Sequence, residues 1–143
     1  MSQPKIGFFS EAINYRPKNI KTIRTWITDT IVKEGKTPGE ISVILCNDSF
    51  LLDMNIKYLG HDTLTDIITF DYTEDSFIAG DIFISIERVK ENAGVFSKSF
   101  ADELHRVIIH GVLHLCGYKD KTQKEQLIMR GKEETYLANF PHL

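Results

Sequence analysis

The sequence predicts a single α+β domain, with a mixed β-sheet of about four strands packed against about five helices. The 143 residues suit one domain with a substantial core. Strand-like and helical segments are mixed along the chain, without the strict β-α-β alternation that builds a fully parallel sheet. No repeat, low-complexity tract or long linker divides the chain, so we expect one domain over residues 1–143.

The first third of the chain is typical of a strand, a helix and a second strand. Residues 5–10 carry the bulky apolar side chains of a short strand. Isoleucines at intervals of three and four residues predict an amphipathic helix over 18–34, closed by Gly35. A turn is expected at 37–39, and alternating Ile, Val and Leu over 41–45 predict the second strand.

The middle of the chain is predicted to supply a short helix and the remaining two strands. Asn47 or Asp48 can cap a helix that ends before Gly60. A polar connector then leads to a β-rich segment over 66–72. After a loop, a fourth strand is expected over 80–85.

Three further helices are expected after the last strand. Ser85 can cap the first, which runs to residue 91. Ser99 begins the second, which is apolar on most faces and is therefore predicted to be the buried central helix. Thr122 and Glu125 form a capping box that opens a final helix through about residue 137.

Composition narrows the classes of function. A net charge of -3 argues against binding nucleic acid by bulk charge but leaves room for a local basic patch. No apolar run approaches the ~20 residues that span a bilayer, and no signal-peptide pattern follows Met1, so we expect a cytoplasmic protein without membrane contact. Cys46 and Cys116 are expected to be buried thiols rather than a disulfide.

Basic residues gather in two places. Taken alone, each cluster reads best as a solvated helix face, and acidic residues interrupt the later one. The early cluster is Arg16, Lys18, Lys21 and Arg24, and the later one is Lys119, Lys121, Lys124, Arg130 and Lys132.

A possible metal site lies on the predicted central helix. His110 and His114 are four residues apart, so they differ by only about 40° around a helix axis and can reach one ion. Gly117 can end the helix and let the chain return, which would bring Asp120 to the same ion with a coordination position left open. The spacing alone also allows two ordinary hydrogen-bonded histidines, as we expect for His105 and His142.

Four blocks of the sequence match the pattern of a known protein family. The family pattern His-Gly-x-Leu-His-Leu-x-Gly-Tyr is matched from His110 to Tyr118. The blocks Thr-Asp-Val-Leu-Ser-Phe and Gly-Asp-Ile are similar to residues 65–70 and 80–82, and an upstream Leu-Asn block to 54–55. Because order and spacing also agree, the sequence resembles the YbeY family of bacterial rRNA maturation factors and is identified as a member of it.

The resemblance implies a fold similar to that of metalloproteases, with a divalent metal in a cleft on a central helix. It implies a metal-dependent endoribonuclease that hydrolyses single-stranded RNA, with His110, His114 and Asp120 as metal ligands. The implied setting is 16S rRNA 3′-end maturation and ribosome quality control, with the ribosome or small-subunit proteins as partners. Thr65 and Asp66 are candidates for shaping the cleft, as is Asp81, although capping and turn hydrogen bonds would explain them equally well.

The chain departs from the family pattern at the third metal ligand, a histidine ten residues after the first, where this sequence has Asp120. Aspartate can ligate zinc, the metal expected first, but it is a harder anionic ligand that also suits Mn²⁺ or Fe²⁺. The alternative for Asp120 is a cap or turn carboxylate without metal contact.

A second departure concerns an arginine that the family usually carries before Thr-Asp-Val. Leu59 stands at the matching position, and His61 or Lys57 could take over a phosphate contact. Alternatively, Leu59 is packed and the RNA is held elsewhere. We expect substrate to enter between the metal and the early basic cluster, where Lys21 and Arg24 would bind RNA.

Two other functions stay open at this point. The protein could be a ribosome-associated binding factor whose metal is structural or lost. A zinc protease is less favoured, because its glutamate base would normally follow the first histidine, where this chain has Gly111.

Overall fold

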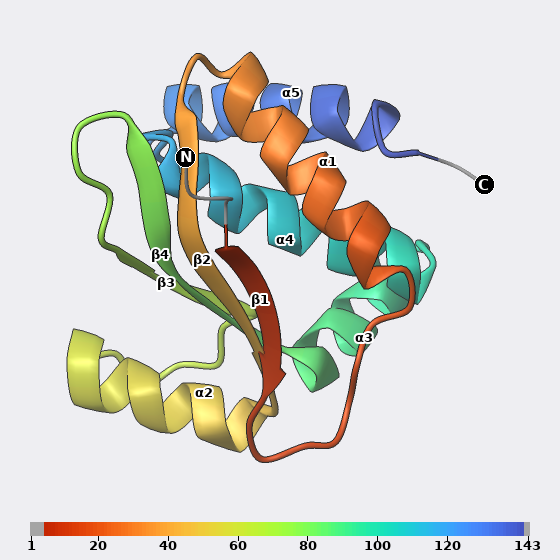
Figure 1. Ribbon diagram of the computed structural model, residues 1–143. Helices are drawn as coiled ribbons and strands as arrows, with labels where there is room; N and C mark the ends of the chain where they lie inside the picture. The colour runs from red at the N-terminus through yellow and green to blue at the C-terminus, as the bar shows by residue number, and fades with distance from the viewer. Residues whose placement is uncertain (1–4, 142–143) are drawn as a thin grey trace.

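A four-stranded mixed sheet with helices on both faces makes up residues 5–141, the part of the chain that the computed structural model describes (Figure 1). His142 and residues 1–4, where a signal peptide would begin, lie outside this part. The elements in chain order are β1 (Lys5–Ser10), α1 (Ile20–Lys33), β2 (Thr37–Cys46), α2 (Asp48–Met54), the π-helical turn η1 (Asn55–Leu59), β3 (Ile67–Asp71), β4 (Phe77–Ser85), α3 (Ile86–Val95), α4 (Phe100–Leu115) and α5 (Gln123–Ala138).

The strands are arranged in the order β1-β2-β4-β3. β1 and β4 both run parallel to β2, whereas β3 pairs antiparallel with β4 and forms an edge of the sheet. The predicted α+β class, mixed sheet and five α-helices are therefore confirmed.

The two faces of the sheet are covered unequally. Helices α1 and α4 cover one face, α5 lies on the outer side of α4, and α2 covers the opposite face (Figure 1). The main core lies between the sheet and α4, where Ile82, Ile84, Ile108 and Val112 are fully buried. Burying each such side chain stabilises the fold by roughly 1.5–3 kcal/mol.

Helix α4 is the central helix that the sequence predicts. The Ser99 hydroxyl caps it by accepting a hydrogen bond from the Asp102 backbone N–H. Gly111 faces the sheet, and a Cβ atom there would lie 2.9 Å from side-chain atoms of Ile67 and Ile82. After the helix, Gly117 has a φ of 110°, a conformation that favours glycine and that turns the chain back along α4.

Some predicted boundaries are wrong. Residues 37–39 begin β2 instead of forming a turn, because Thr37 and Pro38 pair with β4 before a register shift that ends at Ile41. β4 begins at Phe77 instead of residue 80, because a tight turn pairs Glu74 with Phe77. Helix α3 continues to Val95.

Both cysteines are free thiols, as predicted. Cys46 is buried and Cys116 half-buried, and burial raises the pKa of each thiol to about 12. Within the described residues, no helix combines the length and apolar character needed to cross a bilayer.

Candidate metal centre

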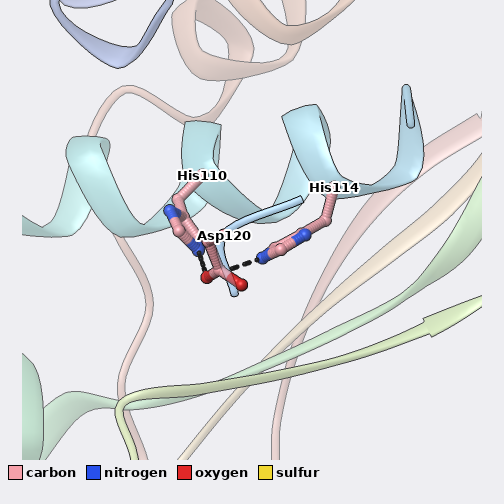
Figure 2. A group of neighbouring side chains, drawn as sticks. All are labelled: His110, His114 and Asp120. Carbon is pink, nitrogen blue, oxygen red and sulfur yellow. Dashed lines mark hydrogen bonds and ion pairs between the residues drawn. The ribbon is translucent and has the colours of Figure 1, made fainter. Parts of the chain in front are cut away.

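Helix α4 and the returning chain bring three possible ligands together. His110 and His114 project from the same side of the helix, and the Asp120 carboxylate lies between them (Figure 2). Asp120 Oδ2 is 3.1 Å from His110 Nε2 and 3.2 Å from His114 Nε2. One ligand atom from each residue lies within 4.8 Å of the others, so all three could bind one ion.

The other ring nitrogen of each histidine is already engaged. His110 Nδ1 lies 2.5 Å from Oε2 of Glu133, whose side chain is only 4% exposed. His114 Nδ1 lies 2.9 Å from the backbone carbonyl oxygen of Tyr118. Partners of this kind fix the tautomer and the ring orientation of histidines that ligate metals.

This arrangement fits a cation between the three residues. The Tyr118 carbonyl and an ionised Glu133 can only accept hydrogen bonds, so both histidines must carry a proton on Nδ1. When the rings are neutral, both Nε2 atoms therefore present lone pairs toward the Asp120 oxygen, which is also an acceptor. A divalent ion, or extra protons, would remove this repulsion.

The charges around His110 determine how easily it gains a second proton. Burial lowers the pKa of His110, but the hydrogen bond to Glu133 and the negative charges of Glu133 and Asp120 raise it, and the net direction is upward. A metal ion would bind the unprotonated nitrogen and so would compete with this proton.

The three residues line a cleft of about 760 Å³ between β3, α4 and α5. Thr65 and Asp66 contribute the wall before β3, and burial raises the pKa of the Asp66 carboxyl. Helix α5 contributes Gln123, Gln126 and Arg130. The cleft therefore presents hydrogen-bonding groups and one exposed arginine around the candidate metal ligands.

A network of charged side chains from α4 and α5 lines the cleft beside His110. Arg106 Nη1 donates to Glu133 Oε1 at 2.5 Å, and Arg106 Nε donates to Glu103 Oε1 at 3.4 Å. Glu133 thus holds both Arg106 and His110, which lie on the same face of α4. Burial raises the pKa of the Glu103 carboxyl, and the Arg106 charge offsets part of that rise.

A second support holds the loop that carries Asp120. The Tyr118 hydroxyl donates to Glu34 Oε1 at 2.5 Å, and the Tyr136 hydroxyl and Lys132 bind the other oxygen of the same carboxylate. Because the Tyr118 carbonyl contacts His114, this clamp connects the end of α1 to the candidate metal centre.

Several residues singled out in the sequence lie elsewhere. Asp81 projects from the other face of the sheet toward Tyr72. The early basic cluster does not line the cleft, and Arg24 donates from α1 to the Ile6 carbonyl on β1, the edge strand opposite β3. Its RNA contacts stay a prediction.

Leu59, at the position where the family usually carries an arginine, and its neighbours Lys57 and His61 also lie outside the cleft. Leu59 is 49% exposed, so the alternative that it is packed is wrong. Neither Lys57 nor His61 lines the cleft, and the Lys57 ammonium lies 5.3 Å from the centre of the Tyr58 ring.

Sequence reasoning missed Arg106 and Glu133. Arg106 stands four residues before His110, a spacing that could have placed it on the same face. Glu133 lies between Met129 and Tyr136 at helical spacing, on the buried face of α5. A carboxylate on a buried helix face needs a partner, and this pattern could have identified Glu133.

Comparisons with known proteins cover nearly the whole chain. A family model described as endoribonuclease YbeY matches residues 6–141. The endoribonuclease YbeY of Flavobacterium psychrophilum is 49% identical over 132 residues, which cover 92% of this chain and 94% of the relative. That of Christiangramia forsetii is 49% identical over 140 residues, covering 98% and 97%. A solution structure of a protein from Thermotoga maritima has a TM-score of 0.66 and 31% identity, covering 94% of this chain and 88% of that chain.

Proposed function

The chain belongs to the endoribonuclease YbeY family, and we propose that it cleaves single-stranded RNA with a divalent metal ion held by His110, His114 and Asp120. One observation carries the metal part of the proposal. Three ligand atoms converge in a cleft, and the second nitrogen of each histidine is already committed to a partner that only accepts hydrogen bonds.

When bound, a divalent ion supplies a Lewis acid that polarises a phosphoryl oxygen and lowers the pKa of a water. Glu133 and the Tyr118 carbonyl keep the two Nε2 lone pairs directed into the cleft. Asp66 stands on the facing wall, where a carboxyl with a raised pKa can hold or release a proton near the substrate.

The donor set suits zinc first, because two imidazoles and one carboxylate with an open position form a common catalytic zinc site. The anionic, harder oxygen of Asp120 also suits manganese or iron. Gly111 leaves no place for the glutamate base of a zinc protease, since its Cα faces Ile67 and Ile82 in the sheet instead of the cleft.

For the biological setting, we propose maturation of the 16S rRNA 3′ end and ribosome quality control in the cytoplasm. The ribosome or its small-subunit proteins would then be partners. The family resemblance of the sequence blocks supports this part of the proposal.

The test combines metal analysis with RNA cleavage. Purified protein is expected to contain one equivalent of divalent metal and to cut a single-stranded RNA oligomer but not the same sequence in a duplex. His114→Ala should lose both metal and cleavage while its circular dichroism spectrum stays unchanged. His61→Ala is the matched control, because His61 is exposed and lies outside the cleft.

Cleavage that persists in His114→Ala would overturn the metal mechanism. Wild-type protein that binds RNA without cutting it would favour the ribosome-associated binding factor. Loss of folding on chelation would identify a structural ion.

A further inference from the structure

A second hollow of about 620 Å³ adjoins the metal cleft. It lies where the N-terminal half of α4 meets the C-terminal half of α5, next to the end of α3. Glu103, Arg106 and Arg130 line both the hollow and the cleft, so they form a wall that the two share. His110 and Arg106 are about one helical turn apart, roughly 6 Å along α4, so neighbouring nucleotides of one strand can reach both sides of this wall.

We propose that the second hollow binds a nucleotide next to the scissile phosphate, with the base against Phe96 and the phosphate on Arg130. This proposal rests on the proposed RNA cleavage. It adds a subsite and a direction for the strand, which would run from the metal cleft along α4 toward its N-terminus.

The shared wall offers one available cation at the point where the strand would cross it. Arg106 is held by Glu103 and Glu133, so its charge is already compensated. Arg130 is exposed, and no hydrogen bond or ion pair to another residue of the described chain holds its guanidinium. Arginine recognises phosphate oxygens through a planar set of N–H donors, so Arg130 fits a phosphate.

The acidic residues of the hollow restrict where that phosphate can lie. Asp102 and Glu134 also line it and would repel a phosphate placed beside them. Lys98 is a further exposed cation in the lining. These mixed charges do not form a general anion-binding patch. They favour a phosphate position next to Arg130.

An exposed aromatic ring supplies the contact for a base. Phe96 ends α3, lines the hollow and is 51% exposed. The guanidinium carbon of Arg106 lies over one face of the Phe96 ring, 5.9 Å from its centre, so a base would stack on the opposite face. Aromatic side chains of this kind bind single-stranded nucleic acid by stacking on bases of any sequence.

A length series separates this subsite from the cleavage site itself. The metal-loaded enzyme is given fluorescein-labelled single-stranded RNA oligomers that grow by one nucleotide at a time from a dinucleotide, and kcat/KM is measured for each. Binding of the same oligomers to metal-depleted protein, in which the proposed cleavage cannot occur, is measured by fluorescence anisotropy. For the wild type, affinity and kcat/KM should rise in a step at the length that reaches the second hollow.

Phe96→Ala should lower the affinity and kcat/KM for long oligomers roughly 10-fold and leave both values unchanged for short oligomers. Arg130→Gln should also reduce the salt slope of binding for the long oligomers by about 0.7, the value for one phosphate of a single strand. Phe9→Ala is the matched control, because Phe9 is 55% exposed but lies on β1. Lys124→Gln serves as the control for Arg130, because it removes an exposed cation of α5 that lines neither hollow.

A wild-type length series without a step, or a Phe96→Ala protein that loses the same factor at every length, would overturn the subsite while cleavage itself stands. A wild type that neither cuts nor binds single strands of any length would overturn the proposed function and the subsite together. Thermal melts of Phe96→Ala and Arg130→Gln must match the wild type for these comparisons to hold.

Discussion

At the scale of single residues, the geometry of the candidate metal centre depends on groups that do not themselves face the ion. Glu133 holds His110, and the Tyr118 carbonyl holds His114. Each partner removes one tautomer and one ring orientation, so the lone pairs meet at Asp120 without further rearrangement. The entropic cost of ordering the ligands is therefore met by the fold and not by metal binding.

Glu133→Gln is expected to weaken metal binding by roughly 10–100-fold, the usual effect of losing a partner of a ligating histidine. The amide keeps the shape of the side chain but loses the charge that holds the Nδ1 proton of His110. Competition with a chromophoric chelator measures the change in the dissociation constant.

Glu134→Gln, on the same helix but exposed, should leave the metal dissociation constant unchanged. Equal affinities for Glu133→Gln and the wild type would contradict a supporting role for Glu133. Melting of the metal-free variants shows whether any decrease in affinity comes from a disturbed fold.

At the scale of the elements, the approach of α4 to the sheet determines where the two histidines lie. Gly111 permits this approach because it places no Cβ against Ile67 and Ile82. Gly111→Ala should therefore destabilise the protein by about 1–3 kcal/mol, since the helix or the isoleucines must shift to admit a methyl group. Urea unfolding followed by circular dichroism measures the free energy of unfolding.

Gly131→Ala provides the comparison for this substitution. Gly131 lies within α5, and a Cβ there would meet nothing within 4 Å. Alanine is a better helix former than glycine, so Gly131→Ala should be neutral or stabilise by up to about 1 kcal/mol. A Gly111→Ala protein as stable as the wild type would show that the interface between α4 and the sheet is looser than these contacts indicate.

Asp48 joins two further elements at the point where β4 ends. Its carboxylate accepts hydrogen bonds from Arg88 at 2.8 Å and from the Ser85 hydroxyl at 2.7 Å, connecting the start of α2 to the start of α3. The hydrogen bond from Arg88, together with its charge and the Ser85 hydroxyl, lowers the pKa of Asp48 below its ordinary 3.8. The stabilisation from these contacts is thus complete above the ordinary pKa and is lost as the pH falls through the lower folded-state pKa.

Asp48→Asn should lower the melting temperature by roughly 2–4 °C at neutral pH. The gap to the wild type should shrink as the pH falls below the ordinary pKa of the carboxyl, because the wild-type carboxylate is then protonated and its ion pair with Arg88 weakens. Asp53→Asn, an exposed position on the same helix, should show no such gap. A difference for Asp48→Asn that stays constant down to acidic pH would refute the electrostatic origin.

At the scale of the whole molecule, local signals account for what the sequence predicts well. The Ser99 cap and the apolar run determine α4 within a few residues, and the spacing of His110 and His114 follows from the helix. Glu133 reaches His110 from another helix, 23 residues away, and no local pattern links them. The turn expected at 37–39 failed for a similar reason, because pairing with β4 outweighs the local preference of Pro38 and Gly39 for a turn.

The distribution of charge over the whole molecule limits where RNA can bind. With a net charge of -3, attraction of RNA cannot be general and must come from local cations. Lys21 is exposed on α1, away from the cleft, so only RNA longer than the cleft can reach it. Lys21→Glu combined with Arg24→Glu should therefore weaken binding of long single strands and reduce the salt slope by about 0.7 for each phosphate that these side chains neutralise in the wild type. Lys90→Glu, which changes an exposed cation on α3 that lines neither the cleft nor the second hollow, is the control and should not change binding. Unchanged binding by the double variant at low salt would exclude α1 from the RNA path, provided that its melting temperature shows that removing the Arg24 bond to Ile6 has not loosened the fold.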